Sequence, residues 1–176
     1  MKIGLCGTMS VGKTTLVHAL QELPEFKDYM FRTERSKYLM SQGIPLNTDS
    51  TLKGQTVFLA ERASELIQEN IITDRTVIDV MAFAQASKSM DWTDKEAFYA
   101  YAIRLIKEYD YIFYVSPEGV EIEDNGIRET DAEYRNEIDI IIRHILSQQK
   151  HRIKRYGVLE GSTEDRIHQM VNYMNL

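Results

Sequence analysis

Apolar and polar residues alternate along the chain in a way that predicts short strands separated by helices. Runs rich in apolar and strand-forming residues occupy positions 2–6, 29–33, 71–73, 111–116 and 156–159. Between them, apolar residues recur at three- and four-residue spacing, which predicts helices over 13–23, 34–42, 52–70, 77–89, 94–109, 132–151 and 163–174. Such alternation favours βαβ units and an α/β fold with a parallel sheet.

The length and organisation of the chain are those of one globular domain. A chain of 176 residues can bury a core without disulfides or a structural metal, and no repeat, low-complexity tract or linker divides it. We therefore expect a single domain over residues 1–176. The least regular stretch begins at Pro117, and we expect a lid over about residues 117–135.

The composition is typical of a soluble, cytoplasmic protein. Hydrophobic residues make up 43% of the chain, and no apolar window is long enough to cross a bilayer, so no membrane partner is expected. The apolar start, residues 1–5, favours a strand over a signal peptide because no cleavage site follows it. Cys6, the single cysteine, ends this strand, and we interpret it as a core residue rather than a nucleophile.

The net charge makes nucleic acid a less favoured partner. It is −6 at neutral pH, whereas proteins that coat a duplex need clustered Lys and Arg for phosphate contacts. The densest basic run, residues 150–155, is interpreted as a solvated helix end, where cations suit the negative pole of the helix dipole.

A glycine-rich phosphate loop is the most specific motif of the sequence. Residues 7–14 read Gly-Thr-Met-Ser-Val-Gly-Lys-Thr and lie where the first predicted strand gives way to a helix. The backbone N–H groups of such a turn converge on phosphate oxygens, the lysine reaches the outer phosphates and the last hydroxyl can ligate Mg²⁺. The predicted ATP-binding residues here are Gly7, Ser10, Val11, Gly12, Lys13, Thr14 and Thr15.

Residues beyond the loop decide which class of P-loop protein this is. An Asn-Lys-x-Asp guanine motif is absent from the sequence, which argues against a GTPase. An Asp-Glu pair after an apolar run, typical of hydrolytic motors, is also absent. Instead, Asp74 and Arg75 follow the third predicted strand, at the carboxyl edge where open α/β sheets bind ligands.

At this point the chain resembles the P-loop kinases of nucleosides and nucleotides. The group is thymidylate-kinase-like in general, and the nicotinamide riboside kinase-like, AAA-type ATPase branch is the nearest in pattern. The resemblance rests on Asp74-Arg75 within residues 73–83, on an acid after the second strand within residues 33–36, on a lid-like run at 127–135 and on a turn at 159–166. The segment from 35 to 69 lacks the Glu-Pro-Gly-Gly start of true thymidylate kinases, so the acceptor is not identified.

The resemblance implies a fold, cofactors and a nucleotide-base site. It implies a three-layer α/β/α P-loop kinase fold with a five-stranded parallel sheet in the order 2-3-1-4-5. It implies ATP and Mg²⁺ as cofactors, a small-molecule nucleoside or nucleotide as acceptor, and a homodimer as a common assembly. It also implies that Gly161, Ser162 and Thr163, in the turn after the last strand, hold the nucleotide base.

Phosphoryl transfer requires in-line positioning and neutralisation of charge on the moving group. We expect Lys13 and the loop amides to hold the β- and γ-phosphates, with Arg128 and Arg135 closing over the transferred group. Thr14 and Asp74 are the expected Mg²⁺ residues, and Arg75 either binds phosphate or pairs with a carboxylate.

Glu34 is the expected acceptor-side base, because a carboxylate within reach of the acceptor hydroxyl can take its proton. The alternative is an acid that stabilises a helix N-terminus.

Several other residues carry two interpretations each. Arg32 and Arg35 either bind an acceptor phosphate or form surface ion pairs. Gln55, Phe58 and Arg62 lie on one helical stripe, which either reads a base or belongs to the core. Asp79 is either solvent-facing or paired along its helix. Trp92 is interpreted as an anchor at a helix start.

The sequence therefore predicts an ATP-dependent phosphotransferase that acts on a nucleoside, nucleotide or related small acceptor. Two alternatives stay open: a kinase that acts on a nucleic-acid hydroxyl, and a nucleotide-sensing regulatory ATPase in which the arginines detect phosphate.

Overall fold

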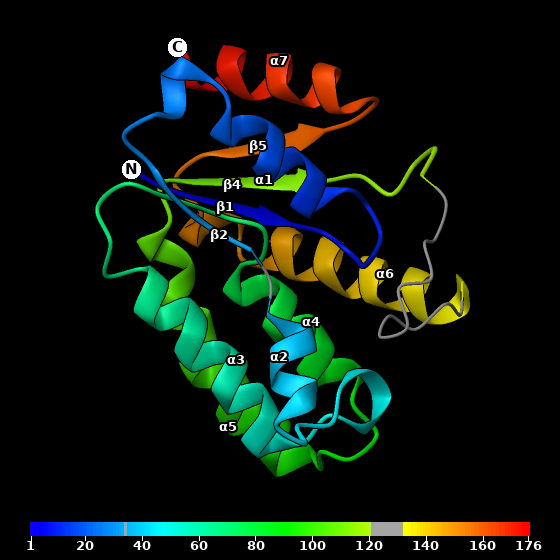
Figure 1. Cartoon of the computed structure of the whole chain (residues 1–176). Coiled ribbons are helices and arrows are strands. Elements are labelled where there is room, and N and C mark those ends of the chain that lie inside the picture. Colours follow the sequence, from blue (N-terminus) through cyan, green and yellow to red (C-terminus); the bar gives the residue numbers. More distant parts are fainter. Residues whose placement is uncertain (34, 121–131) are drawn as a thin grey trace.

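A computed structural model of the chain describes residues 1–33, 35–120 and 132–176. Its centre is a sheet of five parallel strands in the order β2-β3-β1-β4-β5 (Figure 1). The strands are β1 (Lys2–Cys6), β2 (Met30–Arg32), β3 (Ile71–Thr73), β4 (Tyr111–Val115) and β5 (Tyr156–Leu159). This confirms the predicted α/β class and strand order.

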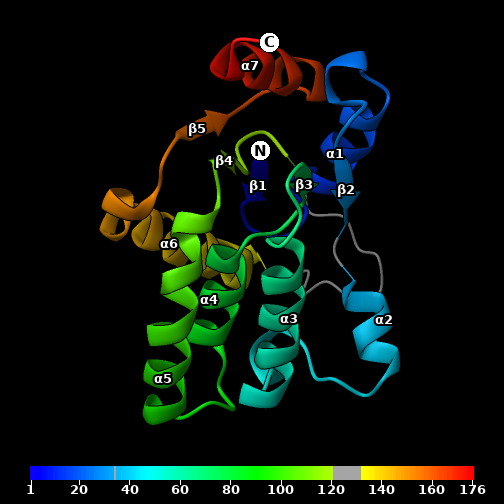
Figure 2. The same ribbon diagram turned by 90° about the vertical axis from the view of Figure 1, so that its left-hand side faces the viewer.

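Helices cover both faces of the sheet, which confirms the three-layer arrangement. On one face lie α1 (Lys13–Gln21) and α7 (Thr163–Met174). On the other face lie α4 (Val77–Ala86) and α6 (Ala132–Gln148), and α2 (Ser36–Ser41), α3 (Leu52–Glu65) and α5 (Trp92–Ala102) extend away from the sheet (Figure 2). Short 3₁₀ helices occupy Pro24–Phe26 (η1), Asn47–Asp49 (η2), Ile103–Glu108 (η3) and Lys150–Arg152 (η4).

The sheet separates two hydrophobic cores. Along β4, Phe113 and Val115 pack with α1 and α7, whereas Ile112 and Tyr114 pack with the opposite helices. Every residue of β4 is buried, as expected for a parallel strand that is covered on both sides. Cys6 is fully buried in the second of these cores, which agrees with its interpretation as a core residue.

One close approach positions the start of α4 against the central strand. A Cβ atom at Gly4 of β1 would lie 2.4 Å from the Thr76 side chain and 2.8 Å from the Tyr109 ring. Only glycine leaves room for this contact. The β3–α4 connection, which follows Asp74 and Arg75, is therefore packed directly onto the strand that leads into the phosphate loop.

Some predicted boundaries were wrong. The helix predicted over 52–70 ends at Glu65, because the chain turns back toward β3, and the N-terminal amine binds the Glu69 carbonyl and the Asn70 side chain. The helix predicted over 94–109 starts at Trp92, capped by Asp91, and its last part is the 3₁₀ helix η3. Trp92 is 77% exposed, so it is no anchor. Residues 132–135 of the expected lid form the first turn of α6, whereas 121–131 lie outside the described residues, so the lid stays a prediction.

Within the described ranges, the structure has no helix of the length and apolarity that a bilayer crossing requires.

Candidate active site

The phosphate loop begins with a glycine that touches its surroundings closely. Gly7 has φ of +154°, and a Cβ atom there would lie 2.7 Å from the Val115 carbonyl oxygen of β4. Its N–H donates to Asp79 Oδ1 at 3.1 Å. The loop then leads into α1, which starts at Lys13. The sequence thus folds into the strand-loop-helix geometry that directs backbone N–H groups toward an anion.

Lys13 lies inside the loop, with 7% of its surface exposed. Its Nζ donates to the carbonyl oxygens of Gly7 at 2.5 Å and Thr8 at 2.7 Å. Burial lowers the pKa of Lys13 to about 8, and the nearby Asp79 carboxylate opposes that shift. The ammonium group is held at the loop, where it can meet the outer phosphates of a nucleotide.

The side chains of Thr14 and Asp74 lie in contact, as a Mg²⁺ site beside a phosphate loop requires. Thr14 Oγ1 donates to Asp74 Oδ2 at 2.7 Å, and the other carboxylate oxygen, Oδ1, is buried without a hydrogen-bond partner in the described part of the chain. A hydroxyl and a carboxylate beside a phosphate loop are the oxygen ligands that Mg²⁺ takes directly or through water. The two residues therefore fit the expected ion.

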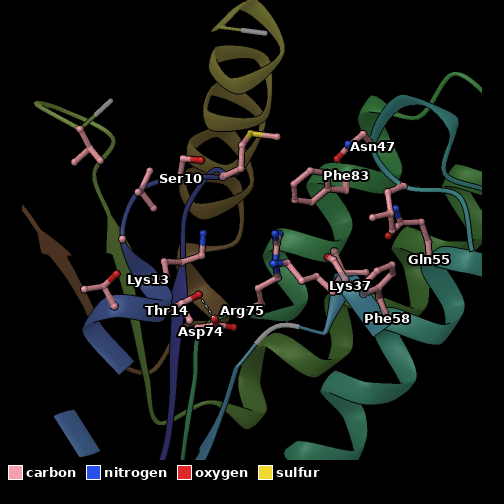
Figure 3. A pocket seen from close by; sticks show the side chains of 18 residues that line it. Ser10, Lys13, Thr14, Lys37, Asn47, Gln55, Phe58, Asp74, Arg75 and Phe83 are labelled. Atoms are coloured by element: carbon pink, nitrogen blue, oxygen red, sulfur yellow. Dashed lines mark hydrogen bonds between the residues drawn. The ribbon is translucent and has the colours of Figure 1, made fainter. Parts of the chain in front are cut away.

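Arg75 faces the space next to this pair. Its guanidinium carbon lies 4.9 Å from the centre of the Phe83 ring, a cation–π contact. No carboxylate forms an ion pair with it among the described residues. The cation is directed at the cavity (Figure 3), and its expected role, as a phosphate ligand or as the partner of a carboxylate, stays a prediction.

A cavity of about 410 Å³ extends from the phosphate loop toward α2, α3 and α4. Figure 3 shows Lys13, Thr14 and Asp74 on one side of it and Phe83, Gln55 and Phe58 on the other. Gln55 and Phe58 are 3% and 9% exposed, and both line the cavity. Apolar walls with a few convergent polar groups are typical of small-molecule sites. Its lining also includes Met9, Ser36, Lys37, Leu46, Asn47 and Val80.

A second hollow, of about 370 Å³, also adjoins the loop. The loop residues Val11, Gly12 and Thr15 line it together with the turn after β5, which comprises Gly161, Ser162 and Thr163. Ser162 caps α7 in a reciprocal pair with Asp165. The structure thus brings the residues predicted for the nucleotide base beside the loop residues predicted for its phosphates.

Two arginines donate hydrogen bonds to backbone carbonyl groups of the loop. Arg166 is 3% exposed and donates to the carbonyl oxygens of Val11 at 2.6 Å and Ser116 at 3.1 Å. Sequence reasoning assigned no role to Arg166, although it ends the turn recognised as similar to a base site. Arg135 donates from Nη1 to the Val120 carbonyl at 2.8 Å and from Nε to the Met9 carbonyl at 3.3 Å. In this arrangement Arg135 binds the loop backbone, so its expected role at the transferred phosphate stays a prediction.

Two expected site residues, Glu34 and Arg128, lie outside the described residues, and their roles also stay predictions.

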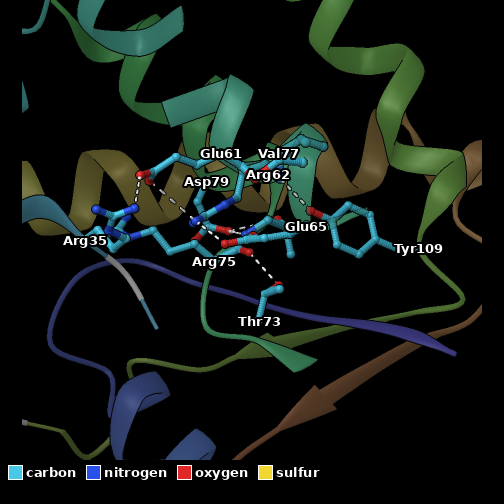
Figure 4. A network of polar contacts seen from close by, with 11 residues as sticks. Arg35, Glu61, Arg62, Glu65, Thr73, Arg75, Val77, Asp79 and Tyr109 are labelled. Carbon is cyan, nitrogen blue, oxygen red and sulfur yellow. Dashed lines mark hydrogen bonds and ion pairs between the residues drawn. The ribbon is translucent and has the colours of Figure 1, made fainter. Parts of the chain in front are cut away.

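The predicted stripe of Gln55, Phe58 and Arg62 divides between the cavity and the core. Gln55 and Phe58 line the cavity, but Arg62 is 1% exposed and pairs with Glu65 at 2.7 Å and Glu61 at 3.8 Å (Figure 4). Burial raises the pKa of Glu65 to about 7, and the Arg62 guanidinium opposes that shift.

The structure also shows the surroundings of Arg32, Arg35 and Asp79. Arg35 pairs with Glu61 at 3.3 Å, while Arg32 is exposed at the end of β2. Both interpretations of Asp79 were wrong: it is fully buried and closes a capping box at the start of α4. The Thr-x-x-Asp pattern of residues 76–79 carried that signal.

Comparisons with known proteins agree with this geometry. A family model described as an AAA domain matches residues 2–166. No sequence match was found among curated proteins. The fold is similar to that of deoxyadenosine kinase from M. mycoides with bound dCTP, at 18% identity and TM-score 0.71, over 99% of both chains.

The fold is also similar to that of the NadR protein in complex with NR, at 18% identity and TM-score 0.76. That match covers 99% of this chain and 51% of NadR, so this chain spans about half of it. YorR from Bacillus subtilis, in complex with phosphorylated GDP, matches at 16% identity and TM-score 0.54, over 98% of this chain and 94% of YorR. With a phosphate loop on a 2-3-1-4-5 sheet and a family match over nearly its whole length, the chain belongs to the AAA domain family AAA_28 and has a P-loop, kinase-like fold.

Proposed function

We propose that the protein is an ATP-dependent kinase that transfers the γ-phosphate of ATP to a hydroxyl or phosphate of a nucleoside, nucleotide or related small acceptor. The observation that carries this proposal is that two cavities adjoin one phosphate loop, one lined also by Gln55 and Phe58 and the other by residues 161–163. A nucleotide switch or simple hydrolase needs one nucleotide site and water. A kinase needs a second chamber, whose occupant lies in line with the terminal phosphate.

The donor would lie across the loop. Its base would contact the turn at residues 161–163, and its β- and γ-phosphates would contact the loop amides and Lys13. Thr14 and Asp74 would hold Mg²⁺, which when bound neutralises charge on the phosphate oxygens. The family's nucleotide-binding loop supports ATP as the donor.

The acceptor would occupy the larger cavity. A base between the Phe58 and Phe83 rings would be held by aromatic contact, and the side-chain amide of Gln55 offers one donor group and one acceptor group to a base edge. Arg75 would hold the end of the acceptor that faces the phosphate. Glu34 would orient the reacting hydroxyl and take its proton late in the step.

Proteins of similar fold support an acceptor of this class. Deoxyadenosine kinase from M. mycoides is seen with the products dCMP and dCDP, and NadR is seen with NR. A cavity of about 410 Å³ suits one nucleoside or nucleotide rather than a nucleic-acid strand. We place the protein in the cytoplasm as one domain of residues 1–176, with a homodimer as the proposed assembly.

An acceptor panel tests the proposal. The protein is incubated with ATP and Mg²⁺ and then with each nucleoside, deoxynucleoside, monophosphate, nicotinamide riboside or oligonucleotide, and ADP and product are followed by chromatography. We expect ADP release that depends on one small acceptor, with a new phosphorylated product. Dependence on oligonucleotide alone would support a nucleic-acid kinase. ADP release that no acceptor changes would support a regulatory ATPase and contradict the proposal.

The Glu34→Gln variant tests the proposed base in the same assay, with Glu25→Gln, in the 3₁₀ helix after α1, as the matched control. Undiminished transfer by the Glu34 variant would show that another group takes the proton.

A further inference from the structure

Asp79 is a buried carboxylate that the proposed chemistry leaves without a role. It lies in the first turn of α4 and has no exposed surface, and no ion pair joins it to another described residue. Burying a carboxylate without a paired cation costs several kcal/mol unless hydrogen bonds compensate.

The two oxygens of Asp79 have different partners. Oδ2 accepts from the N–H and the hydroxyl of Thr76, both at 2.8 Å, and this completes the cap of α4. Oδ1 accepts from the N–H of Gly7 at 3.1 Å. Capping needs only the first oxygen. The second oxygen reaches 72 residues back along the chain, to the first residue of the phosphate loop.

A second carboxylate of the same segment binds the other end of the loop. Asp74, five positions before Asp79, accepts from the hydroxyl of Thr14 at 2.7 Å. Gly7 and Thr14 are the first and last residues of the loop, and Arg75 lies between the two acids in sequence. Arg75 lies in the β3–α4 connection and Asp79 in the first turn of α4, and Figure 4 shows both side chains in the same view.

We propose that Asp79 is a positioning residue that fixes the phosphate loop relative to Arg75 and the acceptor cavity. Asp74 and Asp79 bind the two ends of the loop by hydrogen bonds, so the β3–α4 segment sets the distance between the donor phosphates and the acceptor. The inference rests on the proposed kinase function for its catalytic consequence. The physical tie between Asp79 and Gly7 is independent of that function.

Asp79 acts through the loop and touches neither substrate. Because a misplacement of about 1 Å at a reacting centre can lower a rate about 100-fold, loosening the tie should lower kcat far more than it changes the KM for ATP. Loss of the cap alone should lower stability without this effect on kcat.

Four variants separate the hydrogen bond from Gly7 to Asp79 from the capping of α4 by Thr76 and Asp79. Asp79→Ala removes both, and Asp79→Asn can satisfy either Gly7 or Thr76 but not both, because its amide has one accepting oxygen. Thr76→Val is isosteric and removes only the capping hydroxyl. Asp91→Ala removes the exposed cap of α5, away from the site, and controls for a general loss of stability.

We expect kcat to fall about 100-fold in Asp79→Ala and about 10-fold in Asp79→Asn, with the KM for ATP within about threefold. Thr76→Val and Asp91→Ala should lower the unfolding temperature but keep kcat within about threefold. Hydrogen exchange of the Gly7 amide, followed by NMR, should be at least about tenfold faster in both Asp79 variants than in Thr76→Val.

The proposal is overturned if Asp79→Asn keeps the wild-type kcat although its Gly7 amide exchanges at least about tenfold faster, or if Thr76→Val loses as much activity as Asp79→Asn at equal stability. If Asp79→Ala does not fold, Asp79→Asn decides. If the wild-type protein phosphorylates no acceptor, the proposed function fails, and the exchange rate of the Gly7 amide alone decides whether Asp79 holds the loop.

Discussion

The proposed donor side and the proposed acceptor side of the site are built in different ways. The donor side uses backbone groups of one contiguous loop, residues 7–14, supported by the turn at 161–163. The acceptor side uses individual side chains from three separate helices and the β3–α4 connection, among them Lys37, Gln55 and Phe83. Recognition on the donor side depends on the conformation of the backbone, whereas recognition on the acceptor side depends on the identity of the side chains.

This difference indicates that specificity for the acceptor resides in the side chains of the larger cavity. A phosphate group is recognised by N–H groups that every residue carries, so the loop needs glycines for shape and one lysine for charge. An acceptor is recognised by a few polar groups set in apolar walls, and one exchanged side chain alters the choice. A change on the donor side should therefore affect all acceptors equally, whereas a change on the acceptor side should affect them selectively.

The largest effect is expected from Lys13→Ala. The variant removes the buried ammonium that faces the outer phosphates, and kcat should fall about 100- to 1,000-fold with every acceptor tested. Steady-state kinetics with two different acceptors measure it, and circular dichroism checks the fold. Lys53→Ala, a lysine of α3 outside the cavity lining, is the matched control. A loss confined to one acceptor would break the distinction between the two sides.

The second-largest effect is expected from Arg166→Met, which should destabilise the phosphate loop. The variant keeps much of the side-chain volume but leaves the buried carbonyls of Val11 and Ser116 without their donors, which costs about 3 kcal/mol of unfolding free energy. Urea denaturation measures this loss, and titration calorimetry should show weaker ATP binding. ATP binding at wild-type strength would indicate that the loop keeps its shape without Arg166.

The stability of the acceptor side should depend on pH through Glu65. Its pKa is about 7 in the folded protein, because burial disfavours the charged form, and near 4.5 when the chain is unfolded. The folded state therefore holds a proton that the unfolded state has released. The contribution of Glu65 to stability is full below about pH 4.5 and is lost as pH rises to about 7, by a few kcal/mol.

Urea denaturation of the wild-type protein and of Glu65→Gln, measured from pH 5 to pH 8, tests this linkage. The glutamine variant mimics the protonated acid, so its stability relative to wild type should increase over that range. A constant difference between the two proteins would mean that Arg62 keeps Glu65 charged throughout.

The smallest expected effect is the most selective one. Gln55→Leu removes the amide from the acceptor cavity, so the KM for the best acceptor should rise about tenfold while the KM for ATP stays unchanged. Kinetics with each substrate varied in turn measure both constants. Gln85→Leu, on the exposed side of α4, is the control. Equal changes in both KM values would contradict the assignment of Gln55 to the acceptor.

The sequence predicted best those features that are local. Strand and helix types followed from apolar spacing, and the phosphate loop followed from residues that are adjacent in the chain. The strand order was predicted by resemblance to a family rather than from spacing. The ends of α3 and α5 were wrong by several residues, because caps and turns decide an end more than periodicity does.

The contacts that complete the site were beyond sequence reasoning. The capping pattern at Thr76 and Asp79 was readable, but the bond from Asp79 to Gly7 joins residues 72 positions apart. Arg62 and Gln55 lie on one stripe of α3, yet one enters an ion pair and the other faces the cavity. Which neighbour a side chain meets depends on how helices pack, and a periodic pattern does not contain that information.

The bond between Arg166 and the Val11 carbonyl has a consequence for the newly made chain. The two residues are 155 positions apart, so the loop is synthesised long before the arginine that holds it. We expect the loop of a nascent chain to lack this support until α7 has formed. A chain truncated before α7 should therefore bind nucleotide more weakly than the full 176 residues, as measured by titration calorimetry.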